Sequence, residues 1–184
     1  MKGWKKMYYI PYGYPYPAPY YVPTYTNLGN PQSPDMRWGY WQAEKLKARV
    51  QFNDYGPNPF VVDIEAASEQ NKNYRTALWT GEHLQVTVMS IPVGGDIGLE
   101  VHHDTDQFLR IEEGKGIVRM GKSQNNLSFE RRVREDSAIM VPAGTWHNVI
   151  NTGSEPIKLY TIYAPPHHPH GTVQRTKAEA MAEI

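Results

Sequence analysis

The 184-residue sequence contains no cysteine, which excludes disulfide bonds and thiolate metal ligands. Its 19 basic and 19 acidic residues balance, so no excess positive charge favours nucleic acid or an anionic membrane. No apolar run approaches the length of a membrane span, and the basic N-terminus lacks the apolar core of a signal peptide. We therefore expect a cytoplasmic chain with neither nucleic acid nor membrane among its partners.

Tyrosine and proline are concentrated near the start, in the run YYIPYGYPYPAPYYVPTY from Tyr8 to Tyr25. Proline at this density blocks helices and central strands and favours extended chain. Residues 1–34 are therefore predicted to be a flexible arm. An alternative is a protein–protein contact segment, because tyrosine both stacks and forms hydrogen bonds. In composition the arm resembles spore-coat proteins, and as a coat segment it would place the chain in a spore or cell surface layer.

The remainder divides into three predicted parts. Residues 35–73 read as a linker with two short helices, near 36–52 and 61–70, the second with Asp63 as its N-cap. Residues 74–166 contain eight or more short strands separated by turn residues, the pattern of an all-β jelly-roll barrel. Residues 167–184 form a tail that ends in a helix from about Thr176, rich in alanine, glutamate and lysine.

The chemistry is concentrated in the run GGDIGLEVHHDTDQFLRIEEGKG, with Glu100, His102 and Gln107, and in VPAGTWHNVIN, with His147. Alternation along a strand places Glu100 and His102 on one face. A turn and a second antiparallel strand then bring Gln107 opposite them. Two imidazoles, a carboxylate and an amide oxygen form a plausible mononuclear metal site with mixed nitrogen and oxygen ligands.

These runs resemble the two motifs of the cupin superfamily, G(X)5HXH(X)3,4E(X)6G and G(X)5PXG(X)2H(X)3N. In the first, Gly94, Glu100, His102, Gln107 and Gly114 reproduce the spacing. Two ligand positions depart from the pattern, because Glu100 replaces the first histidine and Gln107 replaces the glutamate. The total ligand charge is unchanged, which favours a retained divalent ion.

The second motif is matched by Pro142, Gly144, His147 and Asn151, with Asp136 at the position of its first glycine. The match over both motifs runs from about residue 76 to 164. It implies a cupin double-stranded β-helix with short peripheral helices, similar to small single-domain bacterial cupins described as mannose-6-phosphate isomerase-like. It also implies a homodimer. We expect Asn151 to fix the turn.

The resemblance leaves several activities open, since cupins include dioxygenases, decarboxylases and sugar isomerases. The expected cofactor is one divalent ion, with Fe, Mn, Ni, Co and Zn all compatible with the ligand set. Catalytic candidates are Glu100 and Asp106, acting on an oxygen-bearing small molecule. Candidates for the wall of the substrate pocket are Phe108, Met140, Trp146, Tyr160 and Tyr163.

Other features carry alternatives. His103 points away from His102 along a strand and is predicted to lie at the surface. The histidines of APPHHPHG, at 167, 168 and 170, form either a second metal site or a solvated tail. A sugar-phosphate isomerase would need a phosphate cradle, but the arginines at 110, 119, 131 and 132 occupy strand positions that face outward. A non-catalytic coat or binding protein is the third function class.

Overall fold

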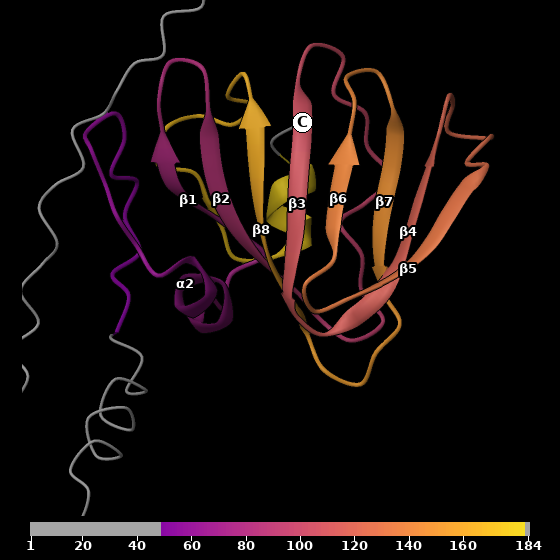
Figure 1. The fold of residues 1–184 in the computed structure, drawn as a ribbon, viewed down its shortest axis with the longest axis horizontal. Helices are drawn as coiled ribbons and strands as arrows, with labels where there is room; N and C mark the ends of the chain where they lie inside the picture. Colours follow the sequence, from indigo (N-terminus) through magenta and orange to yellow (C-terminus); the bar gives the residue numbers. More distant parts are fainter. Residues whose placement is uncertain (1–48, 183–184) are drawn as a thin grey trace, which may run out of the picture. The chain divides into compact units, whose positions relative to one another are not determined.

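The computed structural model describes residues 49–182. The predicted arm, 1–34, lies outside that range, as does most of the predicted helix near 36–52, whose last residues, 49–52, are not helical. The described part forms two antiparallel β-sheets that face each other (Figure 1). This is the jelly-roll arrangement expected from the sequence, with strands drawn alternately from distant parts of the chain.

The larger sheet has the strand order β6-β3-β8-β2-β1-β9, and the smaller has β5-β4-β7. The strands are β1 (Arg75–Thr80), β2 (Gln85–Ile91), β3 (Asp106–Glu113), β4 (Lys115–Gly121), β5 (Phe129–Arg134), β6 (Ala138–Val141), β7 (Trp146–Asn151), β8 (Ile157–Ala164) and β9 (Val173–Gln174). All pairings are antiparallel, so inward and outward side chains alternate in register across neighbours.

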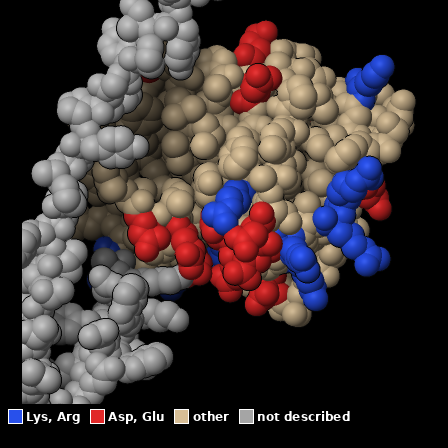
Figure 2. All heavy atoms as spheres, viewed as in Figure 1, with Lys and Arg blue, Asp and Glu red and all other residues tan. Residues whose placement is uncertain are grey.

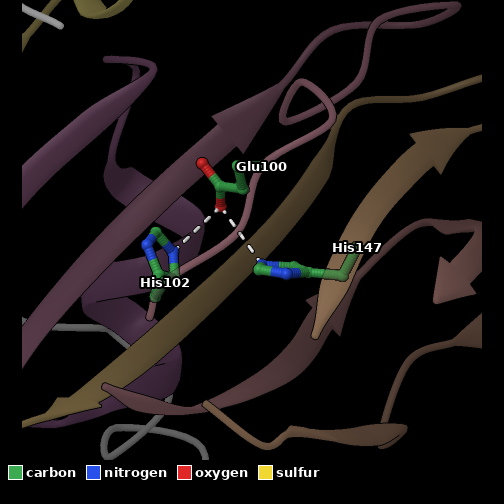
Figure 3. A group of neighbouring side chains, drawn as sticks. All are labelled: Glu100, His102 and His147. Atoms are coloured by element: carbon green, nitrogen blue, oxygen red, sulfur yellow. Dashed lines mark ion pairs between the residues drawn. The ribbon is translucent and has the colours of Figure 1, made fainter. Parts of the chain in front are cut away.

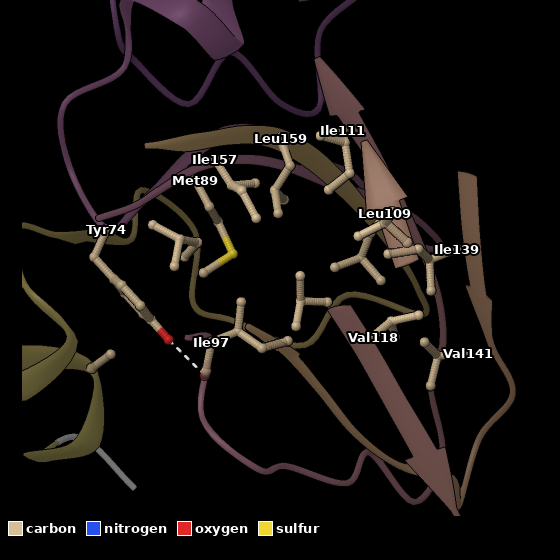
Figure 4. Close-up of a cluster of buried hydrophobic side chains, with 14 residues drawn as sticks. Tyr74, Met89, Ile97, Leu109, Ile111, Val118, Ile139, Val141, Ile157 and Leu159 are labelled. Carbon is tan, nitrogen blue, oxygen red and sulfur yellow. Dashed lines mark hydrogen bonds between the residues drawn. The ribbon is translucent and has the colours of Figure 1, made fainter. Parts of the chain in front are cut away.

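The hydrophobic core fills the space between the sheets. Leu109 and Ile111 from β3 and Leu159 from β8 are fully buried and point toward Val118 of β4 (Figure 4). Fully burying one such side chain contributes about 1.5–3 kcal/mol. At one edge, the Tyr74 hydroxyl donates to the Ile97 carbonyl at 2.7 Å, which fixes the loop that leads to Glu100.

Helix α2 (Ile64–Gln70) packs on the outer face of the larger sheet. Asp63 is its N-cap as predicted, and its Oδ1 accepts a hydrogen bond from Ala66 N at 3.0 Å. Ala67 packs against Leu78 and Val88 there.

The C-terminal segment is part of the fold. β9 pairs with β1, and helix α3 (Lys177–Ala182) follows, close to the predicted start at Thr176. Lys177 Nζ forms an ion pair with Asp96 Oδ1 at 2.6 Å, so α3 is tied to the loop after β2. No helix within residues 49–182 is long and apolar enough to span a membrane.

The predicted hairpin around Gly94 to Gly116 is corrected by the structure. Only its second strand, β3, forms, whereas Glu100 makes an isolated bridge to His147 in β7. Gly94 and Gly98 have φ of 72° and 83°, a left-handed conformation that interrupts a strand and suits glycine.

Candidate metal site

Glu100 and His147 are held opposite each other by the backbone. Glu100 N donates to His147 O at 3.0 Å, and His147 N donates to Glu100 O at 2.9 Å. Such a hydrogen-bonded antiparallel pair directs both side chains to the same face. The carboxylate Oε1 of Glu100 consequently lies 3.3 Å from His147 Nε2.

His102 reaches the same carboxylate oxygen from the loop that precedes β3. Its Nε2 lies 3.4 Å from Glu100 Oε1, and the three side chains converge (Figure 3). The loop is anchored to the Pro142–Thr145 turn, because Gly144 N donates to His102 O at 2.7 Å. One ligand atom from each residue lies within 4.8 Å of the others, the one such group among residues 49–182. Neighbouring ligands of one ion, each at about 2.1 Å, stand about 3 Å apart, so these spacings fit a shared cation.

Five buried polar atoms lack a hydrogen-bond partner at the four residues predicted as ligands. They are Glu100 Oε1, both ring nitrogens of His102, Gln107 Oε1 and His147 Nε2. A buried polar atom without a partner costs about 1–3 kcal/mol, and a cation between Glu100, His102 and His147 would satisfy one atom of each, because these three atoms converge. The residues present therefore fit a divalent ion.

The surroundings prepare each group to act as a ligand. His147 Nδ1 lies 3.0 Å from the Thr145 carbonyl, and a proton held there leaves the Nε2 lone pair directed at the site. Gln107 Nε2 donates to Thr161 Oγ1 at 3.1 Å, which leaves the amide oxygen as the free end. Burial alone raises the pKa of the Glu100 carboxyl, but the imidazoles of His102 and His147 hold that pKa well below its usual range.

Gln107 lies on the inner face of β3, where it is paired with Tyr163 of β8. Both are buried, and the Tyr163 ring lies 5.7 Å from the His102 ring, centroid to centroid. Gln107 as a ligand, and the catalytic role of Glu100, stay predictions. His103 is exposed, as predicted.

Four of the predicted pocket residues lie on the outside. Phe108 and Met140 border a hollow of about 340 Å³ on the outer face of β3 and β6, and Tyr160 borders a second one beside α2. Trp146 alternates with the buried His147 along β7, so its side chain leaves the opposite face. The expectation that these four side chains line the site is thus corrected. Each lies next in sequence to a residue that points inward, so its own side chain points outward.

Asp106 is also displaced from its predicted role. Its side chain is exposed, and Oδ1 accepts a hydrogen bond from Ala143 N at 2.8 Å. It fastens the start of β3 to the Pro142–Thr145 turn instead of facing the ligands. Asn151 does fix its turn, because Nδ2 donates to Ile91 O and Glu155 O while Oδ1 accepts from Gly153 N.

Sequence reasoning did not place His167, His168 or Arg75 beside this site. The His167 ring lies 4.0 Å from the His102 ring and 4.8 Å from the His168 ring. Gln85 holds both histidines in place, since its Oε1 accepts from their backbone N atoms at 3.3 and 2.9 Å. His167 remains exposed and His168 is partly buried, and among residues 49–182 the histidines of APPHHPHG do not form a separate cluster of three metal ligands.

The third is Arg75, a buried arginine on β1. The sequence did contain a signal that Arg75 faces inward. Arg75 lies two residues before Ala77, and residues two apart in a strand point to the same face.

Comparisons with known proteins agree with this architecture. Residues 87–163 match the model of the Cupin domain family. The chain is 53% identical to the uncharacterised protein YrkC of Bacillus subtilis over 183 residues, which cover 96% of this chain and 98% of that one. A crystal structure of BH2720 from Bacillus halodurans has 65% identity and a TM-score of 0.70, covering 71% of this chain and 98% of that chain. An uncharacterised mimivirus protein, L612, is 38% identical over 62% of this chain and 70% of its own length.

Proposed function

Because the chain belongs to the cupin superfamily, we propose that it is a metal-dependent enzyme acting on an oxygen-bearing small molecule. Glu100, His102 and His147 hold the divalent ion, and Gln107 supplies a fourth ligand. The proposal rests on one observation above all, the four buried ligand atoms without hydrogen-bond partners.

The donor set favours an open, reactive site over a closed structural one. Three or four protein ligands leave positions free on a six-coordinate ion, whereas structural zinc sites use four ligands and commonly thiolates. A divalent ion bound here supplies Lewis-acid activation of a substrate oxygen, and with iron also oxygen chemistry. The two-histidine, one-carboxylate set is compatible with Fe, Mn, Ni, Co or Zn.

The chain's own groups orient the ligands and exclude water. Thr145 fixes the ring of His147, and Thr161 fixes the amide of Gln107. The buried Tyr163 ring packs against His102, and His102 and His147 are themselves buried, so electrostatic interactions of these ligands are stronger than in water.

Metal analysis followed by activity assays tests the proposal. Protein purified without added metal is analysed for elemental content, and oxygen uptake is then followed with phenolic and diketone compounds. Near-stoichiometric metal together with oxygen uptake that depends on Glu100 supports dioxygenase-type chemistry. Anaerobic conversion of an aldose or aldose phosphate to a ketose instead identifies a sugar isomerase of the mannose-6-phosphate isomerase-like kind. Metal without turnover on any of these classes contradicts the enzyme proposal and favours a binding or coat protein.

A homodimer is the second part of the proposal, and the outer face of the larger sheet supports it. Met140 is 65% exposed there, beside the hollow bordered by Phe108 and Ile162. The face of the molecule shown in Figure 2 has a broad uncharged area between its groups of charged side chains. Exposed apolar side chains such as Met140 on a face of few charges are typical of protein–protein contacts.

A further inference from the structure

Arg75 is a buried cation without a counterion in the described part of the chain. Its side chain comes from the inner face of β1, and the residue is 4% exposed. Nη1 donates to Gln174 Oε1 at 2.7 Å, but Nε is buried without an acceptor. No carboxylate within residues 49–182 forms an ion pair with this guanidinium. Arginine stays protonated in proteins, so an unpaired buried guanidinium carries a large desolvation penalty.

Two more unsatisfied polar atoms lie in the same neighbourhood. The Tyr163 hydroxyl and His168 Nε2 are both buried without hydrogen-bond partners, and their rings are 5.0 Å apart. Burial raises the pKa of the Tyr163 hydroxyl, and the Arg75 charge opposes that rise. Burial and the same charge lower the pKa of His168 to about 3. The Arg75 guanidinium lies close to the Tyr163 hydroxyl, and the Tyr163 ring contacts the His168 ring, so the three groups adjoin one another.

This cluster adjoins the candidate metal ligands. Tyr163 contacts the His102 ring, and His168 contacts His167, whose ring lies tilted against His102. The Glu100 carboxylate interacts with Arg75 through space, but it is shared by His102 and His147. With a divalent ion bound, the net charge of ion, Glu100 and Arg75 is positive, which favours an anionic ligand.

We propose that Arg75, the Tyr163 hydroxyl and His168 Nε2 form an oxyanion subsite that binds the carboxylate of a small substrate whose second oxygen lies at the metal ligands. The substrate class is therefore a small hydroxy- or oxo-carboxylate. A planar carboxylate suits the free Nε–H edge of a guanidinium, which offers parallel donors in the geometry of a carboxylate. The position of the second oxygen rests on the proposed function, whereas carboxylate binding by Arg75 does not.

The test measures anion binding and metal content separately. Glycolate is titrated into the protein as purified and after treatment with EDTA, by calorimetry and by the shift in Tm. Methyl glycolate, which lacks the charge, is the matched control ligand, and inorganic phosphate is the competing anion. The variants are Arg75→Met and Arg75→Lys, with Arg119→Met as a control because that arginine is exposed and pairs with Glu130 outside the barrel.

Glycolate is expected to bind, methyl glycolate not, and Arg75→Met to weaken glycolate binding about tenfold or more with metal content unchanged. Arg75→Lys should retain only part of the glycolate binding, since lysine keeps the positive charge but lacks the paired planar N–H donors of the guanidinium. The Tm of Arg75→Met without ligand should equal or exceed that of the native protein, because an unpaired buried charge is removed; if Arg75→Met does not fold, Arg75→Lys alone decides the point.

Equal glycolate binding in the native protein and both Arg75 variants overturns the subsite, and so does a preference for phosphate over glycolate. Arg75-dependent glycolate binding in a protein that never holds metal supports the subsite while the proposed metal-dependent function fails. Metal binding with no response to glycolate overturns the subsite and leaves the proposed metal-dependent function standing.

Discussion

Glu100 and His147 are joined twice, through two backbone hydrogen bonds of 3.0 and 2.9 Å and through a 3.3 Å approach of Oε1 to Nε2. The backbone pairing directs the two side chains to the same point. β7 and the loop opposite it thus preorganise the site, which lowers the entropy that ordering the ligands would otherwise cost.

Removal of either imidazole is expected to strip the metal. His102→Ala and His147→Ala should each lower metal affinity more than about 100-fold, since loss of groups that merely orient a ligand already costs about 10–100-fold. His103→Ala, at the exposed neighbouring position, should bind metal normally. Elemental analysis after dialysis measures the effect, and equal losses in all three variants would contradict the assigned facing of this segment.

Gln107→Glu restores the acid usual at this motif position and adds a negative charge. We expect affinity for a divalent ion to rise by about tenfold or more, because ligand charge is a main determinant of cation affinity. Competition with a fluorescent chelator measures the change. Gln107→Leu, which removes the oxygen at similar volume, is the matched control and should weaken binding; unchanged affinity in both variants would show that Gln107 is not a ligand.

The ion pair between Asp96 and Lys177 gives a pH-dependent prediction. Burial raises the pKa of the Asp96 carboxyl. The contacts with Lys177 and with Gly98 N lower this pKa by more than burial raises it, so the pKa lies below its ordinary 3.8. Because the folded-state pKa is depressed, the stabilisation is complete above pH 3.8 and disappears as the pH falls through the folded-state pKa.

Asp96→Asn should therefore reduce Tm near neutral pH by about 2–4 °C and have little effect in strong acid. Thermal unfolding followed by circular dichroism across the acid range checks this. Glu130→Gln, which breaks an exposed pair with Arg119, is the comparison and should change Tm less at every pH. A Tm difference for Asp96→Asn that persists in strong acid would exclude the ion pair as its cause.

Met140→Glu tests the proposed dimer face. A charge placed beside Phe108 should weaken association about tenfold or more, measured by sedimentation or light scattering over a range of concentrations. Phe129→Glu alters another exposed apolar side chain, on β5 of the smaller sheet, and should leave the oligomeric state unchanged. A native protein that is monomeric at all concentrations would refute the dimer directly.

Strand positions and the ligand motif were predictable from local sequence. Asp63 caps α2, and Asp136 adopts the left-handed φ of 66° at the position where the motif has glycine. Asp tolerates that conformation better than most residues, so the departure from the motif leaves the turn intact. His102 and Glu100 converge as predicted even though the strand expected to carry them is a loop.

The wrong predictions had two causes. Some side chains were assigned to the wrong face of a strand, and some contacts join residues that are distant in sequence. Phe108 and Tyr160 were assigned inward because they lie near the motif, yet Gln107 and Thr161 occupy the inward positions of the same strands. His167 reaches His102 only because Gln85 of β2 binds its backbone, a contact that no local pattern encodes. Arg75 was overlooked because charged strand residues usually face water.

The pairing of β9 with β1 places Gln174 beside Arg75, and α3 then attaches Lys177 to the loop before Glu100. β9 and α3 thus complete both the sheet edge at β1 and the support of the loop that carries Glu100. Displacement of this C-terminal segment from β1 would open the sheet edge and loosen the Glu100 carboxylate, so it should weaken metal binding as well as the fold.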